Sequence, residues 1–178
     1  MRRIAIINQK GGVGKTTTCA NLGAALARLG RRVAVFDMDP QANLTMYLGV
    51  DPQDEAPSTY SLLTAGPTEA SQIPAALVPT ATEGLFLVPS HIDLSGAELE
   101  LAASFGRETI LREALDTWER EAREQTGKAP VDYVLLDCAP SLGLLSVNAL
   151  AAVREVLITL QTEFFALQGI AKLVEVVQ

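Results

Sequence analysis

Short apolar runs alternate with alanine-rich or amphipathic stretches along the chain. The runs rich in valine, isoleucine and leucine are typical of strands buried on both faces and lie at 4–7, 32–36, 84–89, 131–137 and 155–160. The stretches with apolar positions at helical spacing lie at 15–29, 93–105, 108–124, 144–151 and 164–178. Strands that alternate with helices predict an α/β fold, with a doubly wound, mostly parallel sheet flanked by helices.

The segments between these elements are less regular. Residues 39–58 are rich in Pro, Asp, Asn and Gly and are expected to form mostly loop, with short helices around Leu44 and over 58–63. Residues 64–82 show no clear period, so no element is predicted there. No repeat or linker divides the chain, and we expect a single domain over 1–178. The strand at 155–160 is expected to form an apolar edge of the sheet.

Composition and charge exclude several classes of protein. The 178 residues carry 14 Lys+Arg against 21 Asp+Glu, a net charge of −7, which argues against a uniformly basic nucleic-acid binder. The two cysteines, Cys19 and Cys138, are far apart in the sequence, so neither a disulfide scaffold nor a cysteine-ligated zinc or iron–sulfur site is expected. No apolar run reaches the ~18 residues of a membrane span, and we expect a cytoplasmic protein with no membrane partner.

A glycine-rich loop between the first strand and the first helix carries the clearest chemical signal. Residues 10–17 read KGGVGKTT; such glycines let backbone N–H groups curve around an anion, while a lysine reaches the β- and γ-phosphates. The standard P-loop pattern has glycine at the position of Gln9, and a purely structural glycine turn is the alternative. We predict that a nucleotide contacts Lys10, Gly11, Gly12, Val13, Gly14, Lys15, Thr16 and Thr17, with the Thr16 hydroxyl on Mg²⁺.

Three aspartates end buried strands and are candidates for the same site. Asp137 ends the apolar run 131–137, where an unpaired carboxylate would be costly, so Mg²⁺ or its bound water is the natural partner. Capping of the next helix is the alternative for Asp137. Asp37 and Asp39 end the second strand and are expected beside the phosphate loop. For Asp37, a structural pairing with a buried lysine stays open as an alternative.

These motifs together resemble the ParA/Soj family of chromosome and plasmid partition ATPases. Lys10 matches the extra lysine of that family's deviant Walker A loop, residues 36–43 (FDMDPQAN) its DxDPQ segment, and residues 135–143 (LLDCAPSLG) its Walker B strand and following loop. The segments 89–98 and 161–169 are similar to Soj as well. The resemblance covers essentially the whole chain and is closer to the chromosomal ParA/Soj branch than to the MinD branch.

The resemblance implies roles for these residues. Lys15 would neutralise the β- and γ-phosphates, Thr17 would contact the α-phosphate, and Thr16 and Asp137 would hold Mg²⁺. Asp37 would support the magnesium shell and the lysines. Asp39 would orient the attacking water. Lys10 would cross to the nucleotide of a partner subunit, so that Lys10, Lys15 and Asp39 form the catalytic set.

The implied activity is that of a Mg²⁺–ATP-dependent dimerising switch in DNA partitioning, with ATP and Mg²⁺ as cofactors. The implied partners are a second copy of the chain, a centromere-binding ParB-like protein that stimulates slow hydrolysis, and non-specific DNA, which would place the protein on the nucleoid. Two alternatives remain: a related ATPase that positions another cargo, and a module that binds nucleotide without hydrolysing it. Because the family continues beyond a segment of this length, we also expect weak discrimination of ATP from GTP and weak DNA binding.

Overall fold

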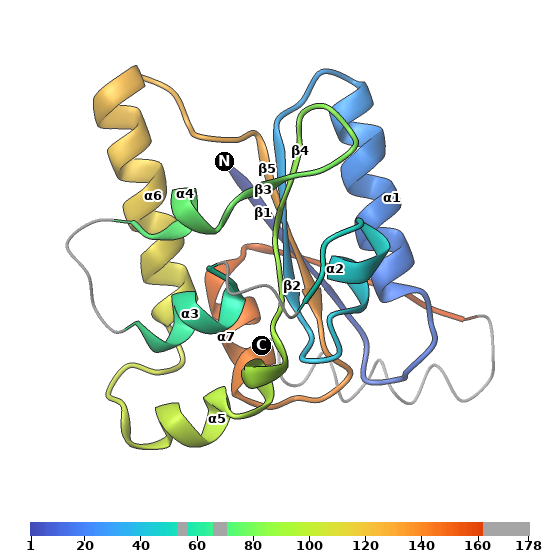
Figure 1. The fold of residues 1–178 in the computed structure, drawn as a ribbon, viewed down its shortest axis with the longest axis vertical. Helices are drawn as coiled ribbons and strands as arrows, with labels where there is room; N and C mark the ends of the chain where they lie inside the picture. The colour runs from blue at the N-terminus through green and yellow to red at the C-terminus, as the bar shows by residue number, and fades with distance from the viewer. Residues whose placement is uncertain (53–56, 66–70, 162–178) are drawn as a thin grey trace.

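A six-stranded, mostly parallel sheet forms the centre of the computed structural model, which describes residues 1–52, 57–65 and 71–161 (Figure 1). The strands are β1 (Arg2–Ile7), β2 (Val33–Met38), β3 (Val78–Pro79), β4 (Leu85–Val88), β5 (Tyr133–Cys138) and β6 (Glu155–Ile158). Their spatial order is β3-β4-β2-β5-β1-β6, and only the pairing of β3 with β4 is antiparallel. The predicted fold class is therefore confirmed.

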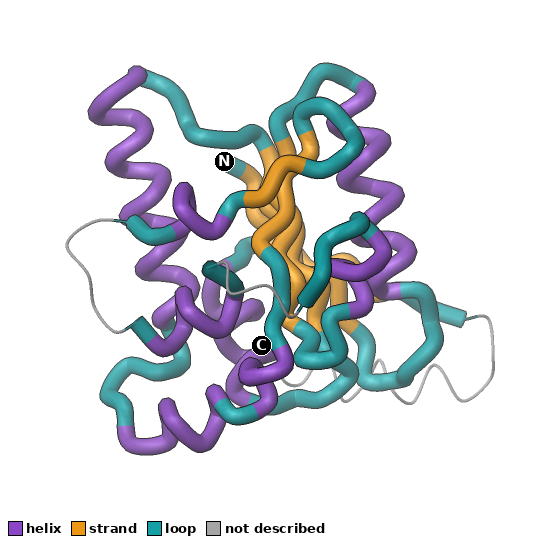
Figure 2. Tube along the Cα trace, in the orientation of Figure 1, coloured by secondary structure: helices purple, strands orange, loops and turns teal. Residues whose placement is uncertain are grey.

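Helices cover both faces of this sheet (Figure 2). The helix α1 (Lys15–Arg28) lies on one face, next to α2 (Asn43–Tyr47). The other face is covered by α3 (Thr59–Thr64), α4 (Ile73–Ala76), α6 (Ile110–Thr126) and α7 (Leu144–Ala152). The segment before α6 contains two 3₁₀ turns, η1 (Ile92–Ser95) and η2 (Leu101–Ala103), on either side of α5 (Ala97–Glu100).

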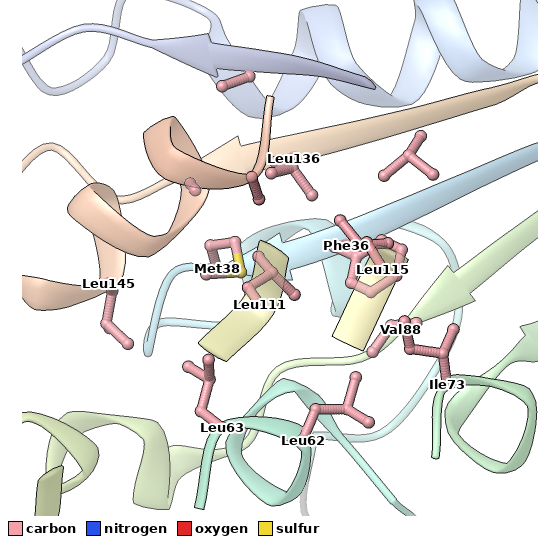
Figure 3. Packing of buried hydrophobic residues seen from close by; sticks show 14 of the residues in the cluster. Phe36, Met38, Leu62, Leu63, Ile73, Val88, Leu111, Leu115, Leu136 and Leu145 are labelled. Carbon is pink, nitrogen blue, oxygen red and sulfur yellow. The ribbon is translucent and has the colours of Figure 1, made fainter. Parts of the chain in front are cut away.

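Two apolar cores lie on the two faces of the sheet because successive strand residues point in opposite directions. Along β2, Val33 and Val35 join the core under α1, whereas Ala34 and Phe36 join the larger core under α6 and α7. Figure 3 shows Phe36 and Leu115 of α6 among the side chains of this larger core. All six residues of β2 are buried, which explains why the strand reads as an apolar run interrupted by a single acid, Asp37.

Two expectations from the sequence need correction, and the order of the strands was not predicted. β5 lies between β1 and β2, and such long-range pairing leaves no local signal. The region 64–82 contains α4 and β3, which are too short to show a period. The helix expected over 93–105 is broken at Gly96, a poor helix former, whose N–H closes a turn to the Asp93 carbonyl.

The remaining elements agree with the sequence pattern to within a few residues. β6 lies at an edge of the sheet, as expected for the apolar strand at 155–160. The helix expected over 164–178 lies outside the described residues. No helix in the described ranges is both long and apolar enough to cross a bilayer.

Candidate nucleotide and magnesium site

The loop between β1 and α1 has the backbone shape that an anion site needs. Gly12 and Gly14 adopt left-handed conformations, with φ of 71° and 87°, and an added Cβ would meet no atom within 4 Å at either position. Glycine is therefore required there by backbone conformation and not by space. Gly14 is the N-cap of α1, and no side chain of the described residues caps that helix. The positive end of the helix is thus left for an anion.

Lys15 and Thr16 start α1 and lie close to the end of β5. Lys15 is 8% exposed, and its Nζ donates a hydrogen bond to the Lys10 carbonyl oxygen at 3.2 Å. Its charge is near enough to Asp137 to lower the pKa of that carboxyl. The Thr16 hydroxyl also favours the charged form of Asp137, although it does not complete a hydrogen bond to either carboxylate oxygen. The structure therefore brings together three of the residues predicted to hold phosphate and Mg²⁺.

Asp137 is a buried carboxylate without a completed hydrogen bond. Its side chain is 1% exposed, and neither oxygen has a hydrogen-bond partner among the described residues. Burial raises the pKa of Asp137 to about 7, and the negative charges of Asp37 and Asp39 add to this, against the lowering by Thr16 and Lys15. An orphaned buried carboxylate of this kind fits a cation, because the ion supplies the missing partner.

The donor set fits magnesium better than a metal held by protein alone. No group of three or more His, Cys, Asp or Glu side chains in the described part of the chain could hold a metal ion. Magnesium does not need such a cage, since it takes one or two protein oxygens and fills its shell with phosphate oxygens and water. The Thr16 hydroxyl and the Asp137 carboxylate are the oxygens that the site offers.

Asp37 lies opposite Asp137 but is fully partnered. The two residues are in register on the neighbouring strands β2 and β5. The Oδ1 atom of Asp37 accepts the Asp39 N–H at 3.1 Å, and Oδ2 accepts both the N–H and the hydroxyl of Thr45, at 2.9 and 2.7 Å. Burial raises the pKa of Asp37 to about 6, although these hydrogen bonds oppose the shift. The geometry fits a supporting role for Asp37, and its contact with Mg²⁺ stays a prediction.

The raised pKa values predict how the nucleotide-free protein responds to pH. A carboxyl whose pKa is higher in the folded state stabilises the fold fully below its unfolded pKa of about 3.8. That contribution is lost as the pH rises through the folded values, about 6 for Asp37 and about 7 for Asp137. We expect the free energy of unfolding to fall by about a few kcal/mol between pH 4 and pH 8, as linkage gives for shifts of this size.

Melting curves of the wild type and of Asp137→Asn measure this effect. The Asn variant should melt higher than the wild type at pH 8 and lose much of the pH dependence, because it removes a buried charge. Glu83→Gln, a change at an exposed residue, is the matched control. Burial would raise the pKa of Glu119, but its hydrogen bonds outweigh this and hold the pKa at about 2, so the stability that Glu119 contributes is lost mainly below pH 4. A melting temperature that does not vary from pH 4 to pH 8 would contradict the prediction.

Lys10 lies at the mouth of the loop and contacts its own chain. Its backbone N–H donates to Asn8 Oδ1 at 2.9 Å, and its Nζ donates to Gln161 Oε1, beyond the end of β6, at 2.8 Å. Asn8 in turn donates to the Thr159 carbonyl oxygen at 2.6 Å. The lysine side chain is exposed, so it is accessible to a second molecule.

The sequence did not single out three residues that shape the site: Asn8, Thr45 and Ser90. Ser90 follows β4 and lies 1% exposed, where its hydroxyl donates to the Asp39 carbonyl oxygen at 2.7 Å. The available signal for Ser90 was its place just after the predicted strand at 84–89, comparable to the place of Asp137 at the end of the apolar run 131–137. Thr45 lies in the short helix α2, where no pattern distinguishes it from a surface threonine.

The fold and this site define a class of protein. A glycine-rich loop leads from the first strand into a helix, and an unpaired acid ends the neighbouring strand of a parallel sheet. These are the features of P-loop ATPases, in the variant that carries a second lysine in the loop.

Comparison with known proteins places the chain more narrowly. Residues 1–178 match the family model described as an AAA domain. The chain is 43% identical over 175 residues to the sporulation initiation inhibitor protein Soj of Bacillus subtilis, covering 98% of this chain and 64% of Soj. It is 45% identical over 178 residues to the chromosome partitioning protein ParA of Caulobacter vibrioides, covering 100% and 62%. The chain therefore belongs to this AAA-domain family, and it is similar to Soj and ParA over almost its whole length.

Solved structures share the fold of this chain. Cobyrinic acid a,c-diamide synthase from Mycobacterium smegmatis, solved with bound ADP and magnesium, aligns with a TM-score of 0.85 and 41% identity, covering 99% of this chain and 66% of that protein. The ATP complex of a McdA variant from Cyanothece aligns with a TM-score of 0.84 and 27% identity, covering 99% and 62%. The chain thus spans less than two thirds of the length of these relatives.

Proposed function

We propose that this chain is the nucleotide-binding part of a Mg²⁺–ATP-dependent dimerising ATPase that acts in chromosome or plasmid partitioning. The observation that carries the proposal is the orphaned, buried carboxylate of Asp137 beside Lys15 and Thr16 at the end of a phosphate loop. Relatives of this chain are named for chromosome partitioning, and structural neighbours were solved with ADP and magnesium, with an ATP analogue and magnesium, or with ATP.

In this proposal each residue of the loop has a distinct task. The backbone of 11–14 and the first turn of α1 hold the phosphates, with Thr17 near the α-phosphate and Lys15 at the β- and γ-phosphates. Thr16 and Asp137 hold Mg²⁺, which when bound neutralises charge on the phosphate oxygens. Asp39 orients the attacking water, and Asp37 holds the backbone of Asp39 in place.

Lys10 is proposed to act across the interface of an ATP-bound dimer. Phosphoryl transfer is accelerated by positive charge near the transferred group, and such charge is often supplied by a second molecule. Lys10 is exposed on the rim of the site, and its hydrogen bond to Gln161 is exposed to water, so that contact costs little to exchange.

Lys10→Ala is expected to bind ATP with nearly wild-type affinity and to lose the ATP-dependent dimer. Light scattering coupled to size exclusion, with ATP and Mg²⁺, measures the dimer, and calorimetry measures the affinity. Lys128→Ala, at an exposed lysine after α6, is the matched control and should dimerise normally. A Lys10→Ala protein that dimerises as the wild type does would rule out a contact between Lys10 and the nucleotide of the partner subunit.

Partitioning further requires that the dimer bind DNA and that a ParB-like protein stimulate slow hydrolysis. Co-sedimentation with non-specific DNA in ATP, in ADP and without nucleotide tests the first step. Binding that appears only with ATP supports the partition function. ATP-dependent dimers without any DNA binding would instead favour an ATPase that positions another cargo. A chain that binds ATP but shows no steady-state hydrolysis, alone or with partner, would be a nucleotide-holding module.

A further inference from the structure

We propose that Thr45 and Ser90 are positioning residues for Asp39, acting through a closed ring of hydrogen bonds that fixes the Asp39 backbone at both its N–H and its carbonyl. The inference rests on the proposed function, because it assigns a purpose to holding Asp39. It adds residues from α2 and from the end of β4 to a site otherwise built from β1, α1, β2 and β5.

The ring can be followed atom by atom. The Asp39 N–H donates to Asp37 Oδ1 at 3.1 Å, and the other oxygen of that carboxylate accepts the Thr45 hydroxyl at 2.7 Å. The Thr45 Oγ1 atom accepts the Ser90 N–H at 2.9 Å. The Ser90 hydroxyl donates to the Asp39 carbonyl oxygen at 2.7 Å, which closes the ring. Each link uses a donor and an acceptor of the correct kind, so no proton has to be shared.

Burial makes the ring stiff. The side chains of Asp37 and Thr45 are fully buried, and Ser90 is 1% exposed, so water does not compete for these hydrogen bonds. Two further contacts support the same atoms, since the Thr45 N–H also donates to Asp37 and the Ala42 N–H also donates to the Asp39 carbonyl oxygen. Asp39 itself is half-buried and is the one member of the ring whose side chain lies outside it.

The ring leaves the Asp39 carboxylate available while its main chain is held. Its Oδ1 atom accepts the Gln41 N–H at 3.0 Å, which sets the direction of the carboxylate. A group that orients a water molecule must itself be held to within a fraction of an ångström, because displacement by about 1 Å can cost on the order of a hundredfold in rate. A network that contacts only the backbone of Asp39 serves this purpose without occupying the reacting side chain.

Variants of the full 178-residue chain test the ring, because ATP turnover and ATP binding can be measured separately in each of them. Thr45→Val keeps the shape of the side chain and removes the hydroxyl, whereas Thr45→Ser keeps the hydroxyl. Ser90→Ala cuts the ring at its other hydroxyl. Thr59→Val is the matched control, because Thr59 is a fully buried threonine whose hydroxyl has no hydrogen-bond partner among the described residues.

We expect Thr45→Val and Ser90→Ala each to lower kcat about ten- to a hundredfold, with the Kd for a non-hydrolysable ATP analogue within about threefold of wild type. Thr45→Ser should recover most of the lost turnover, and Thr59→Val should match the wild type. Because either change opens the same ring, the double variant Thr45→Val/Ser90→Ala should be little slower than the slower single variant. Multiplicative losses in the double variant would show two independent effects and overturn the ring.

Hydrogen exchange of the Asp39 amide, measured by NMR, gives a readout that does not need turnover. Opening the ring should speed this exchange in Thr45→Val and Ser90→Ala but not in Thr59→Val. Unchanged exchange and unchanged kcat in both ring variants would overturn the inference even if Asp39→Ala abolishes hydrolysis. Conversely, an Asp39→Ala protein that hydrolyses ATP normally would refute the role proposed for Asp39, and the positioning inference would fall with it. If the wild type shows no turnover, the exchange rates alone decide whether the ring holds Asp39.

Discussion

Lys15→Ala is expected to abolish binding of Mg²⁺–ATP, with Kd raised at least about a hundredfold. The ammonium group lies at the start of α1, 8% exposed, and is proposed to contact the β- and γ-phosphates. Two charge-assisted hydrogen bonds, at about 1.5–3 kcal/mol each, account for a loss of this size or larger. The variant also removes the positive charge that lowers the pKa of Asp137, so the carboxylate becomes a poorer magnesium ligand at neutral pH.

Isothermal titration calorimetry of ATP with Mg²⁺, at pH 7.5, measures the change. Lys128→Ala serves as the control for the loss of one lysine, and circular dichroism confirms that both variants are folded. Because Lys15 shares the buried site with Asp37, Asp39 and Asp137, we expect Lys15→Ala to be less stable as well. Unchanged affinity for ATP in a folded Lys15→Ala protein would contradict the assignment of the loop.

Asp39→Ala is expected to stop ATP hydrolysis while ATP binding and the ATP-dependent dimer persist. Loss of a group that positions and polarises the nucleophile typically lowers kcat by about a hundredfold or more. The structure makes this a clean substitution, since the ring of Thr45 and Ser90 contacts Asp39 only through its backbone. Alanine at this position therefore keeps the ring and loses the carboxylate with its hydrogen bond to the Gln41 N–H.

Single-turnover hydrolysis, followed with light scattering in the same buffer, separates the two steps. Asp93→Ala, at an aspartate of η1 with a 60% exposed side chain, is the matched control and should hydrolyse ATP as the wild type does. An Asp39→Ala protein that stays monomeric with ATP would show that this residue supports the interface or the fold instead of the chemistry.

The sequence predicts the class of the fold because its strands are buried on both faces and so read as short apolar runs. The helix with the strongest amphipathic pattern, α6 (Ile110–Thr126), agrees with the expected 108–124 to within two residues at either end. Trp118, 5% exposed in the larger core, lies where its helical spacing places it. The order of the strands could not be predicted, because β1 pairs with β5 and β6, and nothing local to either partner encodes that choice.

The site, like the fold, has some features that the sequence predicts and others that it does not. The phosphate loop and the three aspartates could be predicted, because glycine, lysine and acidic residues stand out at the ends of apolar strands. The hydrogen bonds around Asp37 could not be predicted, since Thr45 lies 8 residues from Asp37 in the chain and Ser90 lies 45 residues from Thr45. An acid at a strand end looks the same in sequence whether its oxygens accept hydrogen bonds, as those of Asp37 do, or have no partner among the described residues, as for Asp137.

The position of β5 between β1 and β2 has a consequence for the order of folding. Arg2 of β1 pairs with Tyr133 of β5, and Val33 of β2 pairs with the same tyrosine. The strands β1 and β2 leave the ribosome before the other strands of the sheet, but they do not pair with each other. Strands so far apart in the sequence pair slowly, because the chain loses conformational entropy before the new contacts stabilise the sheet. During synthesis, the phosphate loop therefore stays without Asp137, the acid proposed to hold magnesium, until β5 has emerged. Pulse-labelling hydrogen exchange should find β1 and β2 protected together with β5, so that a nascent chain becomes able to hold nucleotide only once that strand has been made.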